Sequence, residues 1–169
     1  MGSSKYAPAE GHVLTSSYSQ VVGHHCFGCG PDNRCGMRLR FTADEKARTV
    51  ACRVRLPRRF EGPPGHAHGG IVATILDEAM GKVNKMYGLI ALTRRMEIDY
   101  LKPVPLGVLL LISGRAAEVE SDGRKHFRVG EIRNEGGELL ASSTGLFIEV
   151  DAKAMFAKHL AGATSLAKP

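Results

Sequence analysis

The sequence contains no apolar run that approaches the roughly 18 residues needed to cross a bilayer as a helix. It also lacks a block of five or six like charges, and aromatic residues make up only 6% of the chain. Binding of nucleic acid along a basic segment with interleaved aromatics is therefore not expected, although the net charge is +6. The excess of positive charge fits an acidic small ligand instead. We expect no nucleic-acid partner and no membrane partner.

The first residues give no sign of a targeting segment. Residues 1–11 are small and polar and lack the apolar stretch of a signal peptide, so we expect a cytoplasmic protein. The length of 169 residues fits one compact domain, and neither a repeat nor a second domain is visible. We expect a flexible segment at 1–12, a single domain at 13–160 and a flexible tail at 161–169. Residues 13–21 fit a short strand or a short helix equally well.

Four cysteines are present, and three of them lie close together. Disulfides are not expected in a cytoplasmic chain. The spacing Cys26-x2-Cys29-x5-Cys35, with His24 and His25 just before it, is similar to part of a zinc site. Only one Cys-x-x-Cys pair is present and a fourth ligand is not identifiable, so we expect no metal. The fourth cysteine, at position 52, alternates with apolar residues and is typical of a core strand.

The hydrophobic periodicity changes along the chain and predicts the order of the elements. After a glycine- and cysteine-rich loop at 23–36, a period of two at 37–41 and again at 52–56 predicts a hairpin. A long helix is expected at 70–86, ending near Gly88. The remainder is predicted to form strands, beginning at about 96–100 and 108–112, with turns at 122–123 and 135–137 and the last strand ending near residue 150. A short amphipathic helix is expected at 152–160.

The long helix carries apolar residues around most of its circumference, whereas a surface helix has a narrower stripe. One helix cannot cover an antiparallel sheet of five or six strands unless the sheet curls around it. We therefore predict an α+β chain with the hotdog fold, in which a curled antiparallel sheet of five to six strands wraps around one long helix.

Two polar features of this helix suggest chemistry. An acid at Asp77 costs free energy in a mostly buried helix unless it is hydrated or paired, for example with Lys85 or Arg94. Gly69 and Gly70 expose backbone N–H groups at the positive end of the helix dipole, where they can hold a developing oxyanion. The alternatives are a solvated acid and a simple tight turn.

The spacing of the two features favours a site shared between two chains. Gly69 and Asp77 are eight residues apart, which is about 12 Å along a helix. One reacting carbon cannot easily contact both within the same helix. If two such helices run antiparallel across a twofold axis, Asp77 of one chain approaches Gly69 of the other. We expect a homodimer or a dimer of dimers.

Three segments give the sequence a specific resemblance. His68-Gly69-Gly70, followed by six residues and Asp77, resembles the signature of the phenylacetate-pathway thioesterases, which belong with the 4-hydroxybenzoyl-CoA thioesterases of the hotdog superfamily. The segment 26–39 is similar to one upstream of the helix in many members, and 99–107 resembles the strand and exit loop that follow it. The resemblance covers about residues 23–150.

The resemblance implies roles for individual residues. Asp77 matches the catalytic carboxylate, acting as general base or as nucleophile, and the Gly69 N–H matches the group that polarises the thioester carbonyl. Gly70 lies beside it, and His68 matches the motif histidine that orients the loop or the thioester. Thr93 lies where related enzymes often carry a polar residue near the pocket. Apart from the resemblance, four basic residues complete the expected substrate-binding set as candidates for the CoA phosphates, with solvated surface charges as the alternative: Arg95, Lys102, Arg124 and Lys125.

One departure from the family pattern leaves a question open. Glu78 is a second acid next to Asp77, so the pattern does not decide which of the two faces the substrate. The two point about 100° apart on a helix, so only one of them can line the groove well. We count Glu78 among the substrate-binding candidates.

The resemblance predicts an acyl-CoA thioesterase with no cofactor. A hydratase or dehydratase of this fold is the first alternative, but such enzymes usually carry a His-Phe-Pro-Gly loop where this chain has Gly-Pro-Pro-Gly-His66-Ala-His68-Gly-Gly. We read His66 as a loop residue. A non-catalytic module that binds acyl-CoA is the second alternative, and a buried acid argues against it because pure binding does not need one.

Overall fold

The computed structural model describes residues 24–118, 122–151, 154, 155 and 157. The predicted segments 1–12, 13–21 and 161–169, and most of the predicted helix 152–160, lie outside the described residues. No helix in the described part of the chain is long and apolar enough to cross a membrane.

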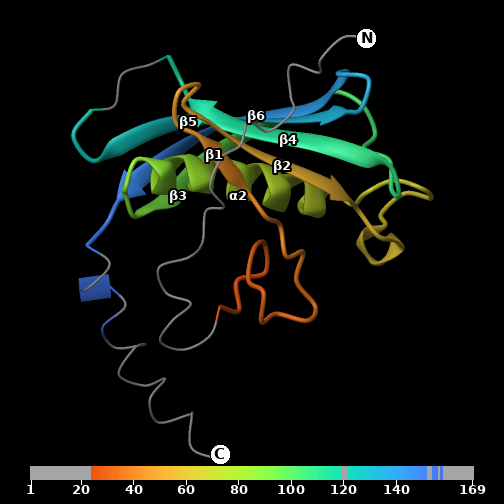
Figure 1. Ribbon diagram of the computed structural model, residues 1–169, viewed down its shortest axis with the longest axis horizontal. Coiled ribbons are helices and arrows are strands. Elements are labelled where there is room, and N and C mark those ends of the chain that lie inside the picture. Colours follow the sequence, from red (N-terminus) through yellow and green to blue (C-terminus); the bar gives the residue numbers. More distant parts are fainter. Residues whose placement is uncertain (1–23, 119–121, 152–153, 156, 158–169) are drawn as a thin grey trace, which may run out of the picture.

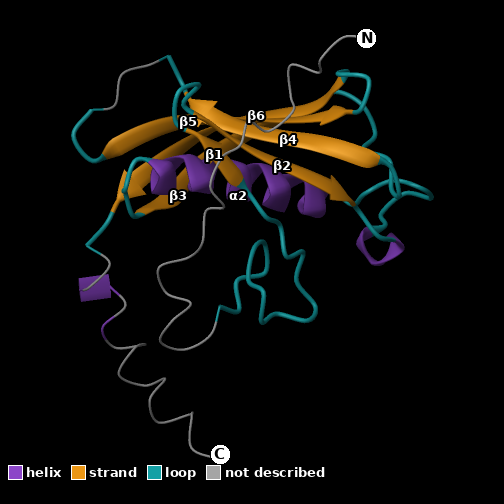
Figure 2. Cartoon of the chain, viewed as in Figure 1, coloured by secondary structure: helices purple, strands orange, loops and turns teal. Residues whose placement is uncertain are grey.

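A six-stranded antiparallel sheet packs one face against a single long helix, α2 (Gly69–Met86) (Figures 1 and 2). The strands are β1 (Thr42–Asp44), β2 (Thr49–Arg55), β3 (Ala91–Tyr100), β4 (Leu109–Ala116), β5 (Lys125–Asn134) and β6 (Leu139–Glu149), with a short 3-10 helix, η1 (Arg58–Phe60), after β2. Their order in the sheet is β1-β2-β4-β5-β6-β3, so β1 and β3 are the edges and the sheet is not closed. The predicted hotdog fold is confirmed.

The core lies between α2 and the concave face of the sheet. Helix residues of the apolar face are fully buried, among them Ile75, Leu76 and Ala79. At Gly114 in β4, an added Cβ would lie only 2.6 Å from the Ala79 carbonyl oxygen, so the sheet reaches the helix backbone where it has no side chain. This close approach lets one sheet curl around one helix.

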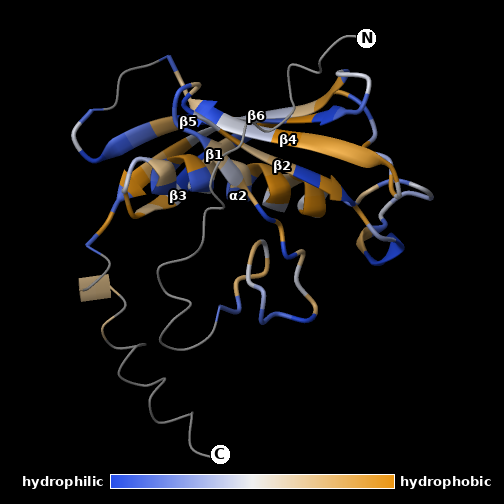
Figure 3. Cartoon of the chain, in the orientation of Figure 1, coloured by the Kyte–Doolittle hydropathy of each residue, from blue (hydrophilic) through white to orange (hydrophobic). Residues whose placement is uncertain are grey.

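Strand β4 carries the predicted apolar run, which Figure 3 colours orange. Its residues 110–112 are all buried, as expected for a strand covered on both faces. The two predicted hairpin turns are also present, and Gly123 and Gly137 adopt positive φ angles of 53° and 84° there. Helix α2 ends where predicted, with Gly88 at a φ of 71°.

The prediction of a strand at 37–41 is wrong. Met37 and Leu39 are buried in alternation, as the periodicity indicated. Their N–H groups, however, donate to the carbonyl oxygens of Phe27 and Gly28 in the cysteine loop, at 2.7 and 2.9 Å. Because this backbone bonds to its own loop and not to the sheet, the first strand begins only at Thr42. The alternating pattern therefore predicted which of these side chains face the core, but not the hydrogen-bond partners of the backbone.

Candidate functional site

The start of α2 holds one backbone donor without a partner. The Nδ1 atom of His68, the residue before the helix, accepts a hydrogen bond from the Gly70 N–H at 3.0 Å. The N–H groups of residues 71 and 72 donate to the His68 carbonyl oxygen. Among the described residues, no acceptor bonds to the Gly69 N–H. The two glycines thus differ: the Gly70 N–H is hydrogen-bonded to the capping His68 side chain, and the Gly69 N–H is available.

Sequence reasoning missed Tyr100 at this end of the helix. Its hydroxyl donates to the Gly69 carbonyl oxygen at 3.2 Å, although 56% of the residue is exposed. A Cβ added at Gly69 would contact the Tyr100 ring at an ordinary 3.7 Å. The alternation of strand 96–100 had suggested only a place in the strand for Tyr100. Its pairing with the helix start depends on the curl of the sheet, for which the sequence carries no signal.

Asp77 lies eight residues along the same helix and is partly buried. Its Oδ1 atom accepts a hydrogen bond from the Thr93 hydroxyl at 2.6 Å, which ties α2 to β3. Thr93 precedes a β-bulge, because the pairing with β6 shifts register between Thr93 and Arg95. Burial raises the pKa of the Asp77 carboxyl, the Thr93 hydrogen bond opposes this, and the negative charge of Glu78 adds to it.

Glu78 lies on another side of the helix. Its Oε1 atom pairs with Lys82 at 3.0 Å, one turn further along α2, and its Oε2 atom lies 3.7 Å from the Cys26 sulfur. The lysine that pairs with an acid of this helix is thus Lys82, which is buried, and not Lys85. The structure brings Asp77 and Thr93 together and places Glu78 against the cysteine loop, away from them. The role of Glu78 as a substrate-binding residue stays a prediction.

The basic candidates fall into two groups: Lys102 lies at the Gly69 end of the sheet, and the other three lie at or near the Thr93 end. Lys102 follows Tyr100 closely and forms an ion pair with Glu138, so it lies at the same end as Gly69. Arg95 is exposed on the edge strand β3, beside the bulge.

The hairpin between β4 and β5 supplies the other two basic candidates. Arg124 donates through Nε to the Glu149 carbonyl oxygen at 3.0 Å, and Lys125 lies 3.9 Å from Asp122 in an exposed pair. Lys125 lies opposite residue 148 of β6, which lies opposite residue 92 of β3, so this hairpin tip is at the Thr93 end of the sheet.

Two of the thiols are unsuited to nucleophilic catalysis. Burial raises the pKa of Cys29 to about 12 and that of Cys52 to about 11, so both are protonated at neutral pH.

Comparison with known proteins finds similarity to one family. Residues 64–141 match the family described as "Thioesterase superfamily". The acyl-coenzyme A thioesterase THEM4 of Xenopus laevis is 33% identical over 104 residues, which are 61% of this chain and 46% of that protein. The crystal structure of protein RHA08564, a thioesterase superfamily protein, has a TM-score of 0.69 at 33% identity and covers 75% of this chain and 61% of that one.

A further solved structure has a bound ligand. The smu.793 protein of Streptococcus mutans UA159, bound to acetyl CoA, has a TM-score of 0.59 at 27% identity and covers 65% of this chain and 86% of that one. Within the hotdog domain described above, residues 64–141 match the thioesterase superfamily, and the proteins similar to this chain include acyl-CoA thioesterases. The chain spans about half the length of the curated relatives that it matches.

Proposed function

We propose that this chain hydrolyses acyl-CoA thioesters to the free acid and CoA. The observation that carries the proposal is the pair formed by a partly buried acid, Asp77, held by Thr93, and a free N–H at Gly69 at the start of the same helix. The names of the relatives, and the acetyl CoA bound by the S. mutans protein, support the same class of substrate.

In the proposed reaction, Asp77 takes a proton from a water molecule whose oxygen attacks the thioester carbonyl carbon. The carbonyl oxygen gains negative charge, which the Gly69 N–H at the positive end of α2 stabilises. The C–S bond then breaks, and the CoA sulfur leaves as a thiolate that takes up a proton. Direct attack by the Asp77 carboxylate is the other route, with a mixed anhydride that water then hydrolyses.

The two groups act on one substrate only if two chains contribute. Thr93 places Asp77 near the beginning of β3, and Tyr100 places Gly69 at its end. If β3 pairs antiparallel with β3 of a second copy, the beginning of one strand lies beside the end of the other. Asp77 of one chain then approaches Gly69 of the second copy. We propose a homodimer with two such shared sites, alone or as half of a tetramer.

Strand β3 has the properties of such an interface. It is an edge of the sheet whose only strand neighbour in the described part of the chain is β6. Arg94 and Arg95 lie in its first half and Glu97 and Asp99 in its second half, so antiparallel pairing with a copy sets basic residues beside acidic ones. Large exposed apolar residues lie on or next to this strand: Ile90, Leu92, Tyr100 and Leu101.

The phosphates of CoA require basic partners near the shared site. Under antiparallel pairing, Lys102 of one chain comes to the same end of the interface as Arg124 and Lys125 of the other. We propose that these residues, together with Arg95, supply the positive charge that holds the nucleotide part of CoA. We also propose a cytoplasmic location, which the four free cysteines support.

Hydrolysis of a graded panel of acyl-CoAs, aliphatic and aromatic, with free thiol as the readout, tests this proposal. Turnover that is saturable and lost in Asp77→Asn is the expected result. Hydration of an enoyl-CoA without release of thiol would favour the hydratase alternative. Tight binding of CoA without turnover of any panel member would make the chain a binding module.

A further inference from the structure

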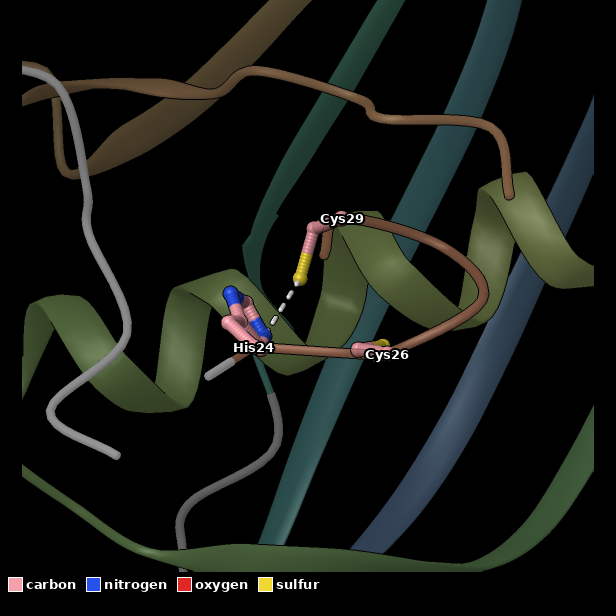
Figure 4. A group of neighbouring side chains, drawn as sticks. All are labelled: His24, Cys26 and Cys29. Carbon is pink, nitrogen blue, oxygen red and sulfur yellow. Dashed lines mark hydrogen bonds between the residues drawn. The ribbon is translucent and has the colours of Figure 1, made fainter. Parts of the chain in front are cut away.

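Three metal-binding side chains converge in the loop that lies against α2. The ligand atoms of His24, Cys26 and Cys29 all lie within 4.8 Å of one another. Figure 4 shows the His24 ring and the Cys29 sulfur pointing toward each other in front of the helix, with His24 Nε2 and Cys29 Sγ 3.6 Å apart. The thioesterase reaction proposed above uses none of these residues.

The separations match those between neighbouring ligands of a tetrahedral metal ion. With zinc–nitrogen and zinc–sulfur bonds of about 2.0 and 2.3 Å, ligand atoms at tetrahedral angles lie about 3.5 Å apart. The His24–Cys29 distance of 3.6 Å is close to this value. A small closing movement of Cys26 would bring the third ligand to the same spacing, because its sulfur already lies within 4.8 Å of the other two atoms.

The structure also supplies the fourth ligand that the sequence did not identify. Glu78 projects from α2 toward the loop, with Oε2 3.7 Å from the Cys26 sulfur. Its other oxygen, Oε1, pairs with Lys82, so one carboxylate oxygen remains for a metal. Carboxylate, imidazole and thiolate are all ligands that zinc accepts. This ligand comes from a residue 49 positions after Cys29, outside any local spacing pattern.

The loop is shaped so that these side chains converge. The Gly30 N–H donates to the Cys26 carbonyl oxygen at 2.9 Å, and a Cβ at Gly30 would lie 2.3 Å from the His24 carbonyl oxygen. Only glycine therefore lets the two ends of the loop meet. The His24 N–H donates to the Asp32 carboxylate at 2.6 Å, and this bond holds the backbone of His24 in place. The loop thus holds His24 near the two cysteines by contacts that involve no ligand atom.

The local charges are compatible with a divalent cation. Two thiolates neutralise the two positive charges of the ion, and Glu78 and Lys82 already neutralise each other. The Lys82 ammonium lies 3.0 Å from the Cys29 sulfur, where it can donate to a metal-bound thiolate as an outer hydrogen-bond donor. The occupied site would therefore carry no net charge although it is partly buried.

We propose that His24, Cys26, Cys29 and Glu78 bind one divalent transition-metal ion of the zinc type. Four protein ligands leave no open position, so the ion is structural and not catalytic. The ion fastens the loop 24–36 to α2, on the side of the helix away from the sheet (Figure 1). Asp77 directly precedes Glu78, the ligand on α2. Metal binding would thereby hold the helix that carries the proposed catalytic acid.

Metal titration of the purified, reduced chain tests the proposal without any activity measurement. We expect cobalt to bind at one ion per chain and to give the visible absorption of a tetrahedral, thiolate-bound ion, which zinc then bleaches by displacement. Cys26→Ser, Cys29→Ser and His24→Asn should each weaken binding by about tenfold or more, since even outer-shell changes typically cost 10–100-fold. Glu78→Gln should weaken it and alter the cobalt spectrum.

The chain contains matched controls for these variants. Cys35 is exposed and outside the cluster, and His25 is the direct neighbour of His24, so Cys35→Ser and His25→Asn should leave affinity and spectrum unchanged. Circular dichroism of every metal-free variant establishes that loss of binding is not loss of folding. If a variant does not fold, the wild-type spectrum and stoichiometry still decide.

Three results would overturn the proposal. The first is the absence of tetrahedral cobalt absorption in the reduced wild type. The second is binding that survives in the Cys26→Ser/Cys29→Ser double variant. The third is a Cys26–Cys29 disulfide found by mass spectrometry in the freshly purified chain, together with no metal uptake after reduction. None of these outcomes bears on thioester hydrolysis, so the two proposals fail separately.

Discussion

The Thr93 hydroxyl donates to Oδ1 of Asp77 across 2.6 Å, and this contact joins the central helix to the edge strand of the sheet. The hydrogen bond fixes the orientation of the Asp77 carboxylate. Its other oxygen, Oδ2, takes no part in this bond. The same bond also links the proposed catalytic group to the strand on which a second copy would assemble. In the proposed dimer, this one hydrogen bond would therefore link the chemistry to the assembly.

Replacing Asp77 by Asn should remove most thioesterase activity, because the amide keeps the shape but cannot accept a proton from water. We expect a loss of about 10²–10⁴-fold in kcat, the typical contribution of general base catalysis. Glu78→Gln should keep turnover within the same order of magnitude, because Glu78 pairs with Lys82. Loss of activity in Glu78→Gln with retention in Asp77→Asn would mean that the acid has been assigned wrongly.

The same variant should gain stability. Burial raises the pKa of Asp77, so at neutral pH the ionised acid destabilises the folded state relative to the unfolded one. Asn carries no such cost, and Asp77→Asn should therefore melt at the same or a higher temperature than the parent at pH 7. The difference should disappear when the pH falls below the pKa of Asp77 in both states. A clearly lower melting temperature at pH 7 would show that the carboxylate stabilises the fold.

Thr93→Val should shift the pH dependence of hydrolysis. The Thr93 hydrogen bond lowers the pKa of Asp77, so its removal raises that pKa further. A base must be deprotonated to act, and the acidic limb of the kcat/KM profile should therefore move to higher pH. Thr93→Ser keeps the hydroxyl and should leave the limb in place. A limb that stays fixed in Thr93→Val would show that Asp77 does not control the profile.

Gly69→Ala separates an oxyanion contact from a simple turn. The added methyl group would contact Tyr100 at an ordinary 3.7 Å, so this chain accommodates it without strain. A loss of kcat, expected at about tenfold and with little change in KM, must then come from crowding at the substrate. Gly81→Ala is the control, since nothing lies within 4 Å of its Cβ, and it should keep full activity. Normal kcat in folded Gly69→Ala would place the donor elsewhere.

A charge exchange on β3 tests the proposed dimer. Arg95→Glu should weaken association, because antiparallel pairing would bring the new acid beside Glu97 or Asp99 of the second copy. The double variant Arg95→Glu/Glu97→Arg restores complementarity and should recover association. The dissociation constant, from sedimentation over a concentration series, is the measurement. A parent chain that is monomeric and fully active would rule out the shared site.

The sequence predicted which side of each element faces the core, because burial follows the periodicity of helix and strand directly. The wrapped helix, the strand order along the chain and both glycine turns were all recoverable in this way. Residues 37–41 were not, since a backbone that bonds to its own loop has the same alternating burial as a strand. The Glu78–Lys82 ion pair was also missed, although a separation of four residues on a helix favours it, because partners were considered only for Asp77.

The segment that matches the thioesterase superfamily, residues 64–141, is smaller than the sheet, whose strands extend from Thr42 to Glu149. A chain cut to these residues would lose β1 and β2 entirely, exposing the edge of β4 that β2 now covers. It would also end within β6, whose later residues pair with β3 from Ala91 to Asp99. Thr93, which holds Asp77, would then lie on a strand that has lost its partner. Truncation studies of this protein should therefore keep at least residues 24–149, or they will measure unfolding in place of function.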